Sequence, residues 1–108
     1  MGSSEERAAR NEALFRDIND QIEEVSRSQQ SAWFDALCEC SDSSCTMTIP
    51  IQADEYEAVR ARGTQFALVA GHEVTAIERV VERADRFVVV EKLGEGARIA
   101  DALDPRAP

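Results

Sequence analysis

The chain has 108 residues, the length of a single domain, and its 44% hydrophobic and 31% charged residues are typical of a globular protein rather than a disordered one. It carries 12 Lys and Arg against 21 Asp and Glu, a net charge of −9, and residues 31–59 contain no Lys or Arg. Because such a surface repels phosphate groups, we expect neither a nucleic-acid partner nor binding to an anionic membrane.

The hydropathy of the sequence bears on where the protein resides. No apolar run approaches the roughly 20 residues that cross a bilayer. Residues 1–15 lack the basic segment followed by an apolar segment that is typical of a signal peptide. We therefore predict a cytoplasmic protein.

Residues 5–27 have the pattern of a helix. They contain no Pro or Gly, and Ser3 or Ser4 can cap the first turn. Apolar residues at spacings of three and four form one stripe, which consists of Phe15, Ile18, Ile22 and Val25. The favoured interpretation is that this stripe packs on the core of the same domain. The alternative is a short coiled-coil contact, through which the helix binds a protein partner or a second copy in a homodimer.

Short strands and helices are predicted to alternate along the rest of the chain. The expected elements are strands at 36–40 and 46–51, a helix at 53–63, a strand at 65–73 and a helix from residue 94.

Residues 75–92 are ambiguous, because Thr75 and Glu78 have the spacing of a helix capping box, whereas β-branched residues flank Ala84 and Asp85 as in a hairpin. The hairpin is favoured. The order then predicts a small single α+β domain with a mainly antiparallel sheet.

All three cysteines lie within eight residues, as Cys38, Cys40 and Cys45. In a strand, residues two apart share a face, so Cys38 and Cys40 present two thiols side by side while Glu39 points away. The polar turn that follows can bring Cys45 back as a third ligand. Structural zinc (Zn²⁺) takes four nitrogen or sulfur ligands, and three Cys with one His is a standard set.

The residues alone leave several candidates for the fourth ligand. His72 is the one histidine of the chain and follows Gly71 at a predicted strand end. Alternatives for the fourth position are Asp42, Glu73 or water. A disulfide is disfavoured by the odd number of cysteines and a reducing compartment, and plain buried cysteine is disfavoured by the polar surroundings.

We divide the chain into an N-terminal helix, residues 1–30, and a zinc-binding α+β domain, residues 31–108.

Catalytic motifs are missing from the sequence. His72 and Glu73 do not begin an HExxH motif, and no glycine-rich phosphate loop is present. Because four protein ligands leave zinc no open position, we expect a non-enzymatic binding or regulatory protein with no catalytic residue. The alternatives are a zinc enzyme with an open position and Glu39 or Glu73 as general base, and a switch in which thiol oxidation releases zinc.

The segments LCECSDSSCTMTIPIQADEYEAVR, FALVAGHE, IERVVER and VVVEKLGEGARIA span nearly the whole chain. Together they resemble a group of small proteins from GC-rich, especially actinobacterial, bacteria. That group shares the patterns F-x-C-E-C-x4-C, E-Y-x-x-V-R, G-H-E and V-V-E-K, although Ala70 stands where the group has Pro before Gly-His-Glu. The resemblance implies that Cys38, Cys40, Cys45 and His72 form one set, and it implies no particular function.

Overall fold

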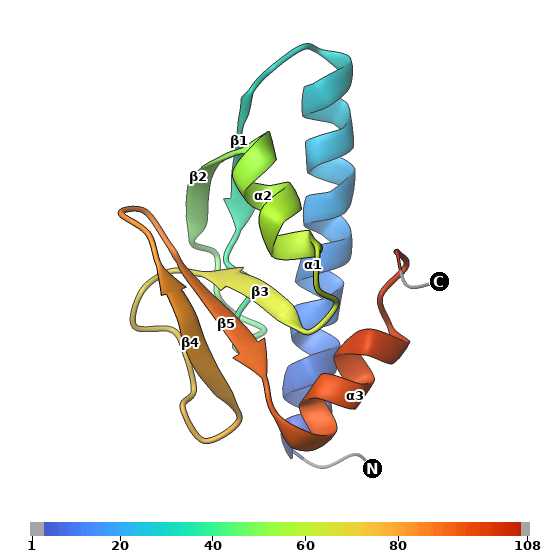
Figure 1. Ribbon diagram of the computed structural model, residues 1–108, viewed down its shortest axis with the longest axis vertical. Coiled ribbons are helices and arrows are strands. Elements are labelled where there is room, and N and C mark those ends of the chain that lie inside the picture. Colours follow the sequence, from blue (N-terminus) through green and yellow to red (C-terminus); the bar gives the residue numbers. More distant parts are fainter. Residues whose placement is uncertain (1–3, 107–108) are drawn as a thin grey trace.

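A computed structural model describes residues 4–106. Its eight elements follow in the predicted order and confirm the α+β class (Figure 1). They are α1 (Ser4–Ser28), β1 (Trp33–Leu37), β2 (Thr48–Gln52), α2 (Ala53–Arg60), β3 (Gln65–Leu68), β4 (Glu78–Arg83), β5 (Val88–Lys92) and α3 (Gly94–Ala102). Among the described residues, no helix has both the length and the apolar character needed to span a membrane.

The strands form two antiparallel sheets rather than one. β1 pairs with β2, and β5 lies between β3 and β4 in a three-stranded sheet. β4 and β5 are joined as a hairpin, whose turn is closed by a 2.9 Å hydrogen bond from Ala84 N to Phe87 O. The predicted hairpin is therefore confirmed, because strand-forming residues on both arms outweigh the single capping-box pattern.

Both faces of β3 and β5 are buried, whereas β4 is mostly exposed. Ala67 of β3 and Val89 of β5 face a core that they share with β1, β2 and α2. Their neighbours on the opposite face, Phe66, Val88 and Val90 among them, join a second core that contains Cys38, Cys40 and Ala100 of α3. The alternation follows from the two-residue period of a strand, and it places two of the cysteines inside a core.

The orientation of α1 is the main departure from the sequence prediction. Ile18 and Val25 of the predicted stripe are 37% and 55% exposed, while Phe15 and Ile22 are only half-buried. The helix does lie on the core of its own domain, but mainly through other residues: of the predicted stripe, Ile22 packs against the first core, while Ile18 and Val25 are exposed. The buried side chains of α1 are mostly polar and small: Ala9, Glu12, Ala13, Arg16, Asn19 and Glu23.

A buried ion-pair cluster joins α1 to the three-stranded sheet. The Lys92 ammonium lies 2.8 Å from Glu12 Oε1 and 3.0 Å from Glu78 Oε1, and all three side chains are fully buried. Burial raises the pKa of Glu12 to about 8, although the attraction of Lys92 lowers it. The second carboxyl group, that of Glu78, adds to the rise. The carboxyl of Glu12 therefore retains its proton at neutral pH in the folded chain.

This raised pKa predicts a pH dependence of stability. Unfolding returns Glu12 to a pKa near 4.5, so between that value and pH 8 the folded state binds more protons than the unfolded state. Stability must then fall as the pH rises through this window. Glu12→Gln should reduce that loss between pH 5 and pH 8 by on the order of 2 kcal/mol, measured by urea unfolding. The exposed Glu82→Gln is the control, and equal pH profiles for Glu12→Gln and the original protein would contradict the assignment.

Candidate metal centre

Side chains of α1 hold part of the backbone of the cysteine segment. Asn19 Oδ1 accepts a 2.8 Å hydrogen bond from Leu37 N, and Asn19 Nδ2 donates a 2.9 Å bond to Leu37 O. About two turns earlier on α1, Asn11 Nδ2 donates to Cys40 O at 3.1 Å. The two amides thus take the place of a neighbouring strand for backbone groups of Leu37 and Cys40.

The sequence prediction of a strand over 36–40 is partly wrong. β1 ends at Leu37, so the Cys38–Cys40 segment lies beyond the regular strand. Cys38 N donates to Met47 O at 3.0 Å, while Glu39 N donates to Ala67 O at 2.9 Å. The segment leaves the β1–β2 sheet and joins the edge of β3 within one residue, so it connects the two sheets of the fold.

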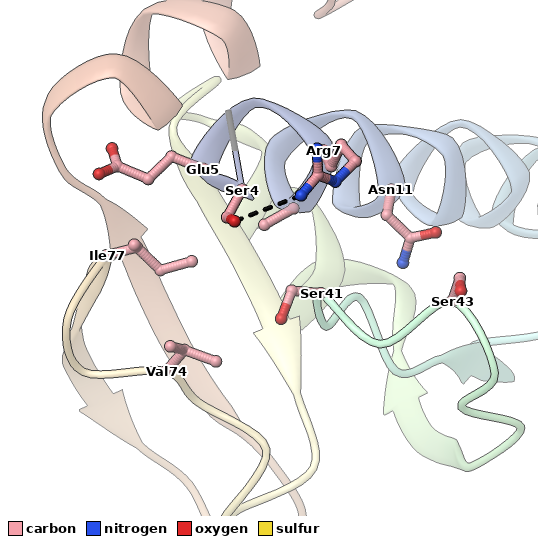
Figure 2. A pocket seen from close by; sticks show the side chains of 9 residues that line it. Ser4, Glu5, Arg7, Asn11, Ser41, Ser43, Val74 and Ile77 are labelled. Carbon is pink, nitrogen blue, oxygen red and sulfur yellow. Dashed lines mark hydrogen bonds between the residues drawn. The ribbon is translucent and has the colours of Figure 1, made fainter. Parts of the chain in front are cut away.

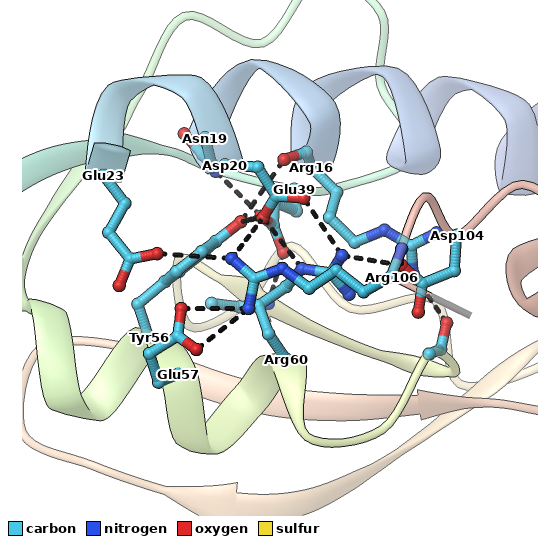
Figure 3. Close-up of polar contacts among 12 residues, drawn as sticks. Arg16, Asn19, Asp20, Glu23, Glu39, Tyr56, Glu57, Arg60, Asp104 and Arg106 are labelled. Carbon is cyan, nitrogen blue, oxygen red and sulfur yellow. Dashed lines mark hydrogen bonds and ion pairs between the residues drawn. The ribbon is translucent and has the colours of Figure 1, made fainter. Parts of the chain in front are cut away.

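The side chain of Glu39 fixes this connection through hydrogen bonds to neighbouring elements (Figure 3). Its carboxylate accepts hydrogen bonds from Asn19 Nδ2 at 2.8 Å, Ala67 N at 3.0 Å and Tyr56 Oη at 3.4 Å. Burial raises the pKa of Glu39 to about 7, although the bonds from Asn19 and Ala67 lower it. These contacts come from α1, β3 and α2, so the residue between the two cysteines anchors the segment to three elements.

A charged network beside Glu39 ties the same elements together (Figure 3). Asp20 on α1 accepts hydrogen bonds from Tyr56 Oη at 2.7 Å and from Arg60 Nε at 2.8 Å. Arg60 on α2 also reaches Asp104 after α3, at 2.7 Å. The two carboxylates hold the pKa of the Arg60 guanidinium above its usual range against the effect of burial. The polar face of α1 thereby fixes α2 and the end of the chain.

A tight turn brings the third cysteine back toward the first two. Asp42 Oδ1 accepts hydrogen bonds from Ser44 N at 2.9 Å and Ser44 Oγ at 2.7 Å, and Cys45 N donates to Asp42 O at 3.1 Å. The bonds from Ser44 lower the pKa of Asp42. Asp and Ser favour such turns because their side chains bond to backbone groups two residues away.

The histidine arrives from the turn that follows β3. His72 N donates to Val69 O at 3.0 Å, and Gly71 has a φ of 94°, a left-handed conformation that favours glycine. Gly71 N donates to Glu73 Oε1 at 2.8 Å, which closes the turn on its other side. The predicted strand at 65–73 is therefore shorter in the structure, because the chain turns after Leu68 and directs His72 at the cysteines.

The structure brings Cys38, Cys40, Cys45 and His72 together as one cluster, in which the ligand atoms all lie within 4.8 Å of one another. His72 Nδ1 is 3.5 Å from Cys38 Sγ and 3.6 Å from Cys45 Sγ. With Zn–S of about 2.3 Å and Zn–N of about 2.0 Å, tetrahedral coordination separates sulfur from nitrogen by about 3.6 Å. The chemistry and the spacing of the four donors therefore fit one metal ion.

The surroundings of the thiols also suit a bound cation. Cys38 and Cys40 are buried, whereas Cys45 and His72 are half-buried. Burial raises the pKa of the Cys38 and Cys40 thiols, and the neighbouring Cys45 thiol adds to the rise in both. Val69 N lies 3.2 Å from Cys38 Sγ as a hydrogen-bond donor, which favours the thiolate. A metal ion would supply the positive charge that three thiolates in this position require.

The other proposed ligands are engaged elsewhere. The carboxylate of Asp42 accepts both of its bonds from Ser44, and that of Glu73 accepts from Gly71 N. The metal-binding cluster found among the described residues contains neither carboxylate. His72 is therefore the side chain that the fold places at the fourth position.

The cysteine loop also borders a cleft of about 590 Å³ (Figure 2). Its walls are the first turns of α1, the loop between Cys40 and Cys45, and the turn that follows Glu73. A rigid metal centre would therefore fix two of these three walls. Most of the lining side chains are polar, namely Ser4, Glu5, Arg7, Asn11, Ser41 and Ser43, and the apolar ones are Ala8, Val74 and Ile77.

Comparison with protein-family models, with curated proteins and with solved structures finds no match to this chain. The chemistry of the site is therefore argued from its own geometry.

Sequence reasoning missed the residues that position the cysteines. Arg16 and Asn19 lie on a polar helix face, which normally faces water, while Asn11 lies beside Ile18 and Ile22 of the predicted apolar stripe. The available signal is that Ala9 and Ala13 share this face, since small residues let a helix approach its neighbours closely. Arg16 uses that approach to donate hydrogen bonds to Gly63 O at 2.6 Å and Ala100 O at 2.9 Å.

The hydrogen bonds of Asn19 can be tested by a substitution of similar volume. Asn19→Leu leaves Leu37 N and O without their partners and removes a donor from Glu39. We expect a loss of about 2 to 4 kcal/mol in the free energy of unfolding, measured in urea. Asn11→Leu, which removes a single bond at a half-exposed position, should cost about 1 kcal/mol or less. Equal effects of the two substitutions would contradict the role given to Asn19.

The raised thiol pKa values predict proton release when a metal binds. Because the buried thiols stay protonated at neutral pH, an ion that binds them as thiolates must displace those protons. Adding zinc to metal-free, reduced protein in weak buffer at pH 7 should release at least two protons per ion, one each from Cys38 and Cys40. Release of one proton or none would show that the three thiols do not bind the ion together.

Proposed function

We propose that this protein is a small non-enzymatic binding or regulatory protein, stabilised by one structural zinc ion. Its ligands are the Sγ atoms of Cys38, Cys40 and Cys45 together with Nδ1 of His72. The observation that carries the proposal is the convergence of these four donors within 4.8 Å, with sulfur-to-nitrogen separations of 3.5 and 3.6 Å. Zinc is favoured among metals because three thiolates and one imidazole form a standard structural zinc set.

A structural role is supported by where the ligands come from. Cys38 and Cys40 follow β1, Cys45 precedes β2, and His72 follows β3. An ion at this point fastens the turn 41–45 and the turn 69–73 to the segment that connects the two sheets. These turns are otherwise held mostly by hydrogen bonds within themselves. Zinc binding of this kind contributes directly to folding.

A non-enzymatic role is supported by closed coordination and by the state of the two candidate bases. Four protein ligands leave tetrahedral zinc no position for water or substrate. The Glu39 carboxylate is buried and accepts its bonds from Asn19, Ala67 and Tyr56. The Glu73 carboxylate is folded onto Gly71 N. Neither is free to activate a water on the ion.

The fourth ligand provides the test of the proposal. His72→Ala should lower zinc affinity by at least about tenfold and lower the melting temperature of the zinc-loaded protein, because water is a weaker ligand than imidazole. His72→Cys restores four protein ligands and should keep most of the affinity. Zinc affinity is measured by competition with a chelator, and the melting temperature by circular dichroism.

Ser43→Ala, a change in the same loop that alters no ligand, is the matched control. Zinc affinity and melting temperature that stay unchanged in His72→Ala would remove His72 from the site. Less than about half an equivalent of bound zinc in freshly purified protein would overturn the structural zinc site itself.

A further inference from the structure

The three thiols of the metal centre differ in how far solvent reaches them. Cys38 and Cys40 are each 1% exposed, whereas Cys45 is only half-buried. The residues on either side of Cys45, at positions 42–44 and 46–48, are all exposed. Because the oxidation of a cysteine requires access to its sulfur, an oxidant in solution meets Cys45 before the other two.

The pairing of the two chain segments sets Cys40 opposite Cys45. Cys38 N donates to Met47 O, which extends the register of the β1–β2 pair by one position. Two residues further along each segment, the same register brings Cys40 and Cys45 to facing positions across the turn between them. Their Sγ atoms lie within 4.8 Å of each other, and a small movement of that turn would bring them to the disulfide length of about 2.05 Å.

Cys38 is less suited to a disulfide than the other two cysteines. In an extended segment, residues two apart project side by side with Cα atoms about 6.7 Å apart, at the upper limit for a disulfide with Cys40. Cys38 Sγ also accepts a 3.2 Å hydrogen bond from Val69 N and lies 3.5 Å from His72 Nδ1. It is therefore held on the side of the turn that follows β3.

We propose that Cys40 and Cys45 form a redox switch of the metal centre, in which a hydroperoxide oxidises the two thiols to a disulfide and the zinc ion is released. The inference rests on the proposed zinc site and adds a means of regulating it. Cys45 is the thiol that meets the oxidant, Cys40 is the thiol that closes the disulfide, and Cys38 stays reduced.

The reaction proceeds in two steps. The Cys45 thiolate attacks one oxygen of hydrogen peroxide, the O–O bond breaks, and the hydroxide that leaves takes a proton from solvent, so that Cys45 becomes a sulfenic acid. The Cys40 thiolate then attacks the Cys45 sulfur, the S–O bond breaks, and the second hydroxide is protonated and leaves as water. The two sulfur atoms together lose two electrons, and the peroxide gains them.

The disulfide removes two of the four ligands of the ion. Cys38 and His72 alone do not complete a structural zinc site, which takes four protein ligands. The turn 41–45 and the turn 69–73 are then no longer fastened to each other. These turns lead into two of the three walls of the cleft described above (Figure 2). Oxidation therefore alters the surface that a binding or regulatory protein would present to its partner.

Titration of the zinc-loaded protein with hydrogen peroxide tests the proposal. The zinc content is measured first, and a coloured chelator then reports zinc release as peroxide is added. About one equivalent of zinc should be released for each equivalent of peroxide consumed, and a dithiol reductant with added zinc should reverse the change. Cleavage of the oxidised protein after Glu39 and before Asp42 separates the three cysteines for mass spectrometry. The fragments that hold Cys40 and Cys45 should be linked, and Cys38 should be free to react with an alkylating agent.

Variants in the same segment separate the switch from general oxidation. Cys38→Ser should still form the disulfide on treatment with peroxide, whereas Cys45→Ser should form none. Met47→Leu is the matched control, since Met47 is 50% exposed and is itself open to oxidation, and it should leave zinc release unchanged.

The outcomes distinguish this proposal from the zinc site on which it rests. Protein that binds zinc and retains it in excess peroxide overturns the switch and leaves the zinc site standing. Zinc release without a Cys40–Cys45 disulfide, or with a disulfide that includes Cys38, also overturns the switch. Protein that binds no zinc overturns both proposals.

Discussion

The fold depends on how α1 satisfies the backbone of the cysteine segment. Residues 37–40 leave one sheet and join another, so part of their backbone lacks a strand neighbour. The amide of Asn19 bonds to both backbone groups of Leu37, and Asn11 bonds to Cys40 O. Burying unpaired peptide groups costs more than a hydrogen bond returns, so these amides must face inward. The inward polar face of α1 is the consequence.

The inward polar face of α1 also determines which ionisable groups are buried. Once polar side chains of α1 face the core, its charged residues are buried as well and need partners. Glu12 finds Lys92, and Asp20 finds Arg60 from α2, which itself holds Asp104 near the end of the chain. Leu14, Ile18 and Val25 of α1 are then left exposed. One backbone requirement thus links the cysteine segment, the ion pairs and the exposed face of the helix.

The sequence contains enough information for the order of elements, because hydrophobic alternation, Gly and Pro report local structure directly. The chemistry of the site could also be anticipated, since three thiols within eight residues and a single His leave few other ligand sets. The orientation of α1 could not, because a helical period in Ile18, Ile22 and Val25 says which residues share a face and not which face is buried. The exact end of β1 could not be predicted for a related reason. Residues 38–40 resemble a strand, but Cys38 N bonds to Met47 O, Glu39 N bonds to Ala67 O and Cys40 O accepts from the Asn11 side chain, so the segment does not stay in one sheet.

X-ray absorption at the zinc edge of protein loaded with one equivalent of zinc tests the central claim most directly. The account predicts about three sulfur ligands near 2.3 Å and one nitrogen near 2.0 Å, with the scattering pattern of an imidazole ring. A first shell dominated by oxygen, or one with two sulfur ligands or fewer, would contradict the claim that α1 and the two turns assemble Cys38, Cys40, Cys45 and His72 around one ion.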